Sequence, residues 1–229
     1  MRDKLRYEIK LVLNEREFTQ VLLWLDIIGA KKKFADRKVN SLYYDNIAQE
    51  AIKHNLAGFA NRNKVRLRWY GDNLLLSSDL QLEIKYREGR LGSKIKHPIS
   101  INMRDFNNCF VSKISDEIFK KIRFSNLKHS SINDYLVPML LVKYQRKYFE
   151  IINGLRITID NKIQFYDASQ NIKLNSLRAI NYSPYVVEIK FSNDYKNQVS
   201  NLLKPTLLTP KRHSKYLAGL AILGYISYV

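Results

Sequence analysis

Three basic side chains recur at every second position in one short segment of the chain. Lys64, Arg66 and Arg68 alternate with apolar residues, and a strand would place them on one face, about 7 Å apart. Like charges this close repel each other, whereas a sheet face selected only for solubility more often carries mixed charges, Thr and Ser. Arg can grip phosphate oxygens through a bidentate fork, and Lys acts as a mobile point charge. The pattern therefore favours a strand face that binds phosphate groups.

Basic residues also occupy the polar positions of other alternating segments. For any single segment, the simplest interpretation is the solvated face of a sheet. If the strands close into a barrel, these side chains converge on one interior, and only a bound polyanion would offset their repulsion and lost hydration. Such closure would give a strongly basic interior, and the alternation by itself leaves open whether the sheet closes. The additional basic residues are Lys10, Lys85, Arg87, Arg156 and Lys190.

Three carboxylates precede a lysine by two positions on the same strand faces. Glu8, Glu83 and Glu188 each begin the pattern Glu-x-Lys. For Glu83, a local ion pair and a metal ligand are equally good interpretations. For Glu188, and less strongly for Glu8, we favour a ligand of Mg²⁺ or Mn²⁺, because such ions are commonly held by one or two carboxylates together with substrate phosphates.

Helical patterns separate the alternating segments. Asn14 can cap a helix that begins at Glu15, and further helices are expected over residues 47–59, 115–124 and 193–203 and from about residue 214. Several antiparallel strands with a few helices indicate an α+β protein. Without an internal repeat or a Gly/Ser linker, we expect one domain over residues 1–229.

The composition predicts an anionic partner. The chain of 229 residues has 39 Lys and Arg against 21 Asp and Glu, a net charge of +18, which suits nucleic acid, a membrane surface or a phosphorylated metabolite. Its single cysteine, Cys109, excludes an intramolecular disulfide and a cysteine-based zinc site. No signal-type stretch follows Met1, and the apolar run 217–229 is too short to span a bilayer. We expect a cytoplasmic location without a transmembrane segment, and peripheral membrane association and the oligomeric state stay open.

Eight short motifs occur in order from about Tyr7 to Tyr216. This series resembles the VTC domain of polyphosphate polymerases, a branch of the triphosphate tunnel (CYTH-like) enzymes. The motifs are Tyr7-Glu8-Ile9-Lys10, Ser41-Leu42-Tyr43-Tyr44-Asp45-Asn46, Lys64-Val65-Arg66-Leu67-Arg68-Trp69-Tyr70, Leu82-Glu83-Ile84-Lys85, Tyr144-Gln145-Arg146-Lys147-Tyr148-Phe149, Leu155-Arg156-Ile157-Thr158-Ile159-Asp160, Val187-Glu188-Ile189-Lys190 and Ser214-Lys215-Tyr216.

The resemblance implies a closed antiparallel β-barrel, a tunnel with helices packed on the outside. In this tunnel the terminal phosphate of ATP would be transferred onto a growing polyphosphate chain with the help of a divalent metal. Positioning and charge stabilisation supply most of the catalysis in such reactions. By motif, Glu188 would bind the metal, and Ser214 and Lys215 would contact phosphate near one tunnel mouth. Apart from these, Tyr43, Tyr44 and Asn46 could orient a substrate, and of the three we assign Tyr44 to substrate binding. The residues expected to hold phosphates are Lys10, Lys64, Arg66, Arg68, Lys85, Arg146 and Arg156.

One departure from the family pattern bears on the reaction. Triphosphatase relatives typically begin with Glu-x-Glu-x-Lys, whereas this chain has Arg6-x-Glu8-x-Lys10, and losing a potential metal ligand favours the polymerase branch. A tripolyphosphatase or nucleoside triphosphatase on the same barrel is an alternative, as is a non-catalytic sensor of polyphosphate or inositol polyphosphates. Specific nucleic-acid binding ranks last, because it would need exposed aromatic platforms or a helix for a groove.

Overall fold

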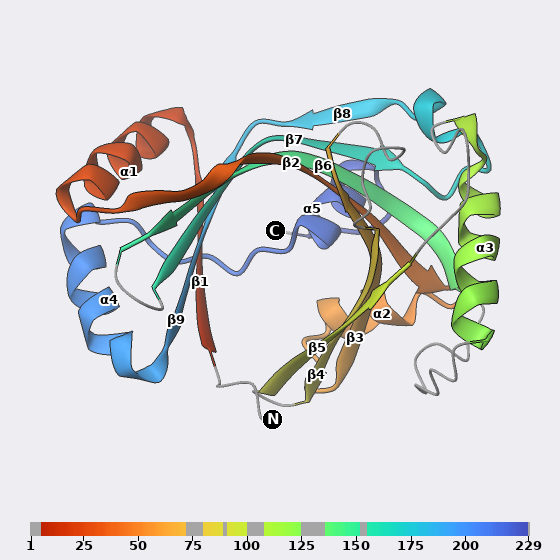
Figure 1. The fold of residues 1–229 in the computed structure, drawn as a ribbon, viewed down its shortest axis with the longest axis horizontal. Coiled ribbons are helices and arrows are strands. Elements are labelled where there is room, and N and C mark those ends of the chain that lie inside the picture. The colour runs from red at the N-terminus through yellow and green to blue at the C-terminus, as the bar shows by residue number, and fades with distance from the viewer. Residues whose placement is uncertain are drawn as a thin grey trace. The chain divides into compact units, whose positions relative to one another are not determined.

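A computed structural model describes residues 6–71, 80–88, 91–99, 108–124, 136–151 and 155–228 (Figure 1). The described strands belong to one sheet. They are β1 (Arg6–Leu13), β2 (Lys31–Asn46), β3 (Arg62–Tyr70), β4 (Gln81–Glu88), β5 (Leu91–Pro98), β6 (Leu136–Glu150), β7 (Arg156–Asp167), β8 (Ala179–Tyr182) and β9 (Tyr185–Ser192). Their order is β1-β9-β7-β6-β2-β3-β4-β5, and β8 pairs with β7.

The large antiparallel sheet and its helices confirm the α+β class, but the expected closed barrel is wrong. Within the described residues, β1 and β5 are the two ends of the strand order and do not pair with each other. Alternation with period two gives every strand a polar and an apolar face in an open sheet and in a barrel alike. Periodicity therefore located the strands without showing whether the sheet closes.

Five α-helices lie among the described residues, close to the segments expected to be helical. Asn14 caps the first: its side chain accepts a hydrogen bond from the Glu17 backbone N–H at 2.9 Å, and the Glu17 carboxylate accepts one from the Asn14 N–H at 2.8 Å. No helix in the described ranges is both long and apolar enough to cross a membrane. The helices are α1 (Glu15–Ile27), α2 (Glu50–Leu56), α3 (Val111–Phe124), α4 (Lys196–Leu203) and α5 (Lys215–Ile222), with 3₁₀ turns η4 (Leu174–Ser176), η5 (Asn193–Tyr195) and η6 (Lys204–Thr206).

The chain divides into two compact units, and each unit combines three separate stretches of sequence. The long strands β2, β6 and β7 contribute residues to both units. The expectation of a single domain over residues 1–229 stays a prediction. The first unit comprises Met1–Lys38, Tyr144–Ile163 and Asn181–Ser214, and the second comprises Val39–Lys143, Gln164–Ile180 and Lys215–Val229.

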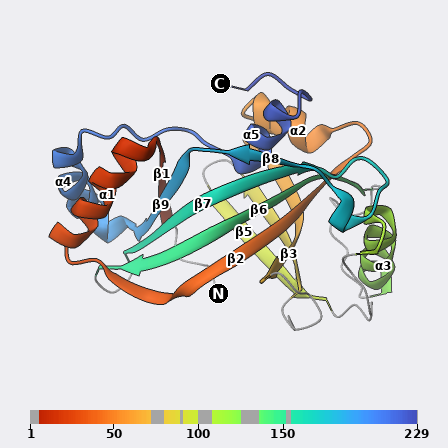
Figure 2. The same cartoon turned by 90° about the horizontal axis from the view of Figure 1, so that it is seen from above.

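The core of the first unit lies between its strands and the helices α1 and α4 (Figure 2). Leu11, Ile157 and Ile189 are buried from β1, β7 and β9, and Val21 is buried from α1. The indole N–H of Trp24 donates to the Leu202 carbonyl at 2.8 Å, which ties α1 to α4. Burial of this apolar face fixes which side of the strands carries the polar residues.

The core of the second unit lies between β3, β4 and α3. Val65 and Leu67 of β3 and Ile84 of β4 pack in one buried cluster with Ile114 and Ile118 of α3. Ile114 and Ile118, four residues apart, therefore form the buried stripe of this helix. The opposite face of β3 and β4 is left for the alternating charged residues.

Candidate functional site

One face of β3, β4 and β5 gathers basic side chains of the second unit. In the antiparallel register, residues directly opposite each other on neighbouring strands lie on the same face, so these side chains form rows across the sheet. We call Lys64, Arg66, Arg68, Lys85, Lys94 and Lys96 the basic face. Its rows across the three strands are Lys64–Lys85–Lys94, Arg66–Glu83–Lys96 and Arg68–Gln81–Pro98.

Glu83 is the carboxylate within these rows, and it is shared by three cations. Arg66 Nε donates a hydrogen bond to Glu83 Oε2 at 2.7 Å, and Arg66 Nη2 lies 2.6 Å from the same oxygen. Arg68 lies 3.5 Å from the same oxygen, and Lys94 pairs with Oε1. Burial alone would raise the pKa of Glu83, but Arg66 and Arg68 outweigh it and hold the pKa at about 2. Of the two interpretations left open for Glu83, the structure shows the ion pair, and the face keeps an excess of positive charge.

Lys94 has an unusual environment for a lysine. Burial lowers its pKa to about 8, and the neighbouring charges of Arg66 and Arg68 act in the same direction against the attraction of Glu83. The charge on Lys94 therefore changes within a pH range in which an ordinary lysine stays protonated.

Tyr43 connects the basic face to α5. Its hydroxyl accepts a hydrogen bond from Arg66 Nη1 at 3.0 Å, and its ring stacks on Tyr216 with centroids 4.9 Å apart. Burial would raise the pKa of Tyr43, but Arg66, Arg68 and Lys215 together lower it. Lys215, at the start of α5, thus acts on the same site as Arg66.

Tyr44 lies on the other face of β2. The register pairs Tyr43 with Arg66 and Tyr44 with Val65, so the two tyrosines point to opposite sides of the sheet. Tyr44 is 1% exposed and meets Phe119 of α3 edge-on in the apolar cluster. The structure therefore corrects the expected placement: Tyr43, rather than Tyr44, lies with the basic residues.

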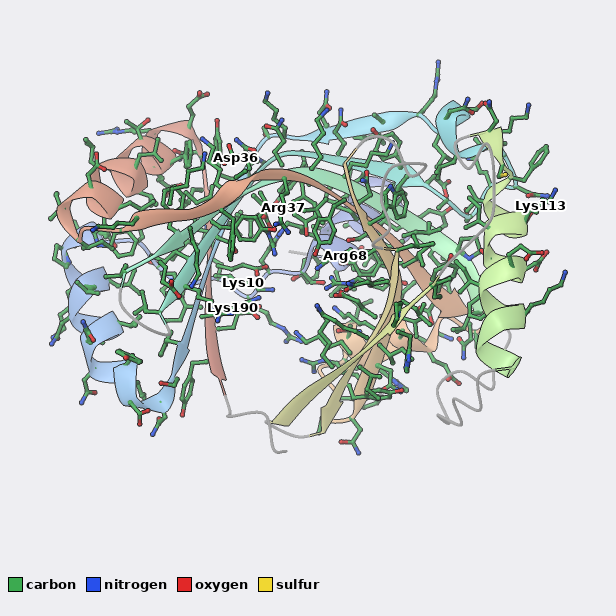
Figure 3. All side chains as sticks on the ribbon, viewed as in Figure 1. Lys10, Asp36, Arg37, Arg68, Lys113 and Lys190 are labelled. Carbon is green, nitrogen blue, oxygen red and sulfur yellow. The ribbon has the colours of Figure 1, made fainter. Side chains whose placement is uncertain are left out.

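The polar face of the first unit carries charges of both signs. We call Glu8, Lys10, Glu188 and Lys190, on the neighbouring strands β1 and β9, the mixed-charge face. Figure 3 shows Lys10 and Lys190 reaching to the same side of these strands. Lys10 Nζ lies 3.0 Å from Glu8 and 3.8 Å from Glu188, and Lys190 Nζ lies 3.5 Å and 3.2 Å from the same two carboxylates. Each lysine is therefore balanced by two carboxylates, in contrast to the basic face.

Arg146 is held within the first unit by a buried carboxylate. Its Nε and Nη2 atoms lie 2.5 Å and 2.7 Å from the two oxygens of Asp160, which is fully buried. Burial would lower the pKa of Arg146, but Asp160 outweighs it and raises the pKa well above the usual value. Nη2 also lies 3.8 Å from Glu188. Arg146 thus lies beside Glu188 of the mixed-charge face, and Asp160 already uses part of its hydrogen-bonding capacity.

Glu8 and Glu188 suit a divalent cation only where further ligands, such as substrate phosphates, complete its coordination. Among the described residues, no group of three or more His, Cys, Asp or Glu side chains could hold a metal ion. Two carboxylates suffice where substrate phosphates complete the coordination of Mg²⁺ or Mn²⁺. The donor set therefore suits a metal that arrives with phosphate.

The remaining candidate site residues are Arg156, Ser214 and Arg87. Arg156 is 54% exposed and lies 3.9 Å from Glu150. Ser214 immediately precedes α5, after His213, whose carbonyl accepts a hydrogen bond from Lys10 Nζ at 3.0 Å. The backbone of Arg87 belongs to β4, but its side chain lies outside the described residues.

Sequence reasoning overlooked Lys94 and Lys96. Their spacing across Ile95 repeats the alternation of β3 and β4, and it was the available signal for a further basic strand. Asp160 belongs to one of the eight motifs, but its pairing with Arg146 was not predicted, because a buried partner follows from the fold and not from local spacing.

Comparisons with known proteins agree with this arrangement. The family model for the VTC domain matches residues 5–224. A search of curated proteins gives no match. Among solved structures, a protein from Bacillus halodurans described as an adenylate cyclase candidate has a TM-score of 0.58 at 12% identity, covering 95% of this chain and 98% of its own. A candidate adenylyl cyclase from Hippeastrum, described as having a dominant triphosphatase activity, has a TM-score of 0.57 at 16% identity and covers 96% of each chain. The chain therefore belongs to the VTC domain family and shares its fold with these two solved structures.

Proposed function

We propose that the protein is a metal-dependent phosphotransferase that moves the terminal phosphate of ATP onto a growing chain of inorganic polyphosphate. The observation that carries this proposal is the basic face, where rows of cations share Glu83 as their carboxylate. Such a face is unfavourable alone and becomes favourable when a polyanion supplies the missing negative charge.

The chain's own residues would act by positioning and by charge. Arg66 and Arg68 present guanidinium groups that can hold phosphate oxygens in a fixed orientation. Lys64, Lys85 and Lys96 would neutralise charge on the transferring and accepting phosphates, and fixed cations of this kind stabilise phosphoryl transfer without covalent chemistry. Within the first unit, Glu188 and Glu8 would hold Mg²⁺ or Mn²⁺ together with phosphate, and the metal would supply neutralisation of phosphate charge.

Hydrolysis of the same substrates is the second candidate function. The Hippeastrum protein of the same fold is described as having a dominant triphosphatase activity, and water can replace the acceptor phosphate at such a site. The replacement of the first family Glu by Arg6 favours transfer over metal-dependent hydrolysis, because it removes a potential metal ligand.

Product analysis tests the proposal. The purified protein is incubated with ATP and Mn²⁺, and the products are separated on a polyacrylamide gel stained for polyphosphate. We expect a ladder that disappears in Arg66→Ala and persists in Lys120→Ala, an exposed lysine of α3 whose loss changes the net charge equally. Free phosphate without a ladder would indicate a triphosphatase. Tight polyphosphate binding without turnover would indicate a sensor.

A further inference from the structure

An exposed aromatic pair lies beside cationic side chains in the first unit. Phe34 of β2 and Tyr148 of β6 meet edge to face, with ring centroids 5.7 Å apart and an interplanar angle of 89°. The guanidinium carbon of Arg37 lies 5.7 Å from the Phe34 centroid and 6.0 Å from the Tyr148 centroid. Phe34 is nevertheless 48% exposed. The pair thus offers aromatic surface and a stacking cation to a ligand.

The surroundings of this pair point towards phosphate. Lys33 lies 5.9 Å from the Phe34 ring and forms an ion pair with Glu150. Glu150 also approaches Arg156, an exposed arginine that the sequence assigns to phosphate. A contiguous set of side chains therefore runs from the aromatic pair to a candidate phosphate ligand.

The strand geometry places the aromatic pair near the mixed-charge face. Tyr148 lies two residues from Arg146 along β6, so both side chains belong to the same side of the strand. Arg146 in turn contacts Glu188. Figure 3 shows Arg37 and Asp36 on opposite sides of β2, and Arg37 is the one whose guanidinium reaches both aromatic rings.

We propose that Phe34, Arg37 and Tyr148 form a platform on which the nucleobase of a nucleoside triphosphate stacks, while its phosphates extend towards Arg156. The assignment rests on the proposed function, since it requires a nucleotide as the phosphate donor. Aromatic rings and Arg stack on any base because every base has a π-face. The platform therefore accepts a nucleobase without selecting one kind.

A single-stranded nucleic acid is the rival ligand for exposed aromatic residues. Proteins that bind such strands stack successive bases on several platforms along a basic groove. Here the aromatic pair connects through Lys33, Glu150 and Arg156 to candidate phosphate ligands, an arrangement that suits a ligand with one base and a terminal run of phosphates. We therefore favour the free nucleotide.

The experiment compares two ligands that differ by the nucleoside. Dissociation constants for ATP and for inorganic tripolyphosphate are measured with the native protein, Phe34→Ala, Phe34→Trp and the control Phe59→Ala. Phe59 is 54% exposed and contacts His54 instead of the platform. We expect Phe34→Ala to weaken ATP binding about tenfold and to leave tripolyphosphate binding unchanged. Phe34→Trp should retain the affinity for ATP, and Phe59→Ala should alter neither ligand.

The possible failures can be told apart. If Phe34→Ala weakens both ligands equally, or neither, the platform is refuted while the phosphate site stands. If the native protein binds neither ligand, the platform fails together with the proposed function. Suppose that an adenine oligonucleotide without a 5′-triphosphate competes with ATP as effectively as tripolyphosphate competes with it. The aromatic pair then belongs to a nucleic-acid surface and the proposal is overturned.

Discussion

Glu83 lies almost fully buried between Arg66, Arg68 and Lys94, so the charge balance of the basic face depends strongly on this carboxylate. Removing one cation leaves Glu83 with two partners. Removing Glu83 leaves three cations facing one another, of which Arg68 is buried, and an uncompensated buried charge is costly. The two kinds of substitution should therefore differ in their effect on the free protein.

Glu83→Gln should lower the free energy of unfolding by about 3 kcal/mol, and tripolyphosphate should recover much of that loss. The pKa of Glu83 is about 2 in the folded protein, below its usual value near 4.3. Its contribution is therefore complete above about pH 4.3 and is lost as the pH falls towards 2. Thermal melting with and without tripolyphosphate measures the effect. If the Glu83→Gln variant is as stable as the native protein without ligand, the three cations do not need this carboxylate.

The affinity for tripolyphosphate should decline as the pH rises above about 8, because Lys94, with a pKa of about 8, then loses its charge. Lys94→Met should bind more weakly than the native protein at about pH 7 and should approach it by about pH 9.5. The two affinities are compared at each pH, because the ionisation of tripolyphosphate affects both proteins equally and drops out of their ratio. A constant ratio of the two affinities across this range would show that Lys94 does not contact the phosphates.

At the scale of the elements, β2 decides which tyrosine serves the site. Tyr43→Phe and Tyr44→Phe each remove one hydroxyl. The first should weaken tripolyphosphate binding a few-fold, because Arg66 loses the acceptor 3.0 Å away, and the second should not, because Tyr44 faces α3. Titration calorimetry on both variants checks the prediction. Equal effects would mean that the faces of β2 are assigned the wrong way round.

The helix α5 depends on close approach to the sheet at Gly219. A Cβ at this position would lie 2.7 Å from side-chain atoms of Leu140 and of Phe165. Gly219→Ala should therefore cost about 1–3 kcal/mol through overpacking and disturb the stack of Tyr216 on Tyr43. Combining it with Leu140→Ala provides the space, so the double variant, measured by thermal melting, should lose less stability than the sum of the single losses. Additive losses would show that the contact with Leu140 is not what destabilises the Gly219→Ala variant.

The elements were more predictable than their pairing. Local signals located the Asn14 cap, the buried stripe of α3 and the alternating strands, because each depends on neighbouring residues. The link of Arg146 to Asp160 and the choice of Tyr43 over Tyr44 depend on register between strands distant in sequence. Alternation fixes the two faces of a strand but not what lies opposite them, so those contacts could not be read from spacing.

At the scale of the whole molecule, a net charge of +18 would attract many polyanions without any specific site. The described cations are distributed unevenly: the mixed-charge face pairs its lysines with Glu8 and Glu188, whereas the basic face shares Glu83 among three cations. General attraction depends on total charge, while binding at the basic face depends on position. A phosphate site on the basic face therefore requires that affinity depend on where a cation lies and not only on the total charge.

The most direct measurement is the affinity of inorganic tripolyphosphate for the native protein, Arg66→Ala and Lys120→Ala at one ionic strength. Both variants lose one positive charge, but Arg66 belongs to the basic face and Lys120 is an exposed residue of α3. We predict that Arg66→Ala binds more than about tenfold more weakly, with little change in melting temperature because Glu83 keeps Arg68 and Lys94, and that Lys120→Ala binds like the native protein. Equal losses in the two variants would contradict a phosphate site on the basic face and leave only the attraction of the net charge.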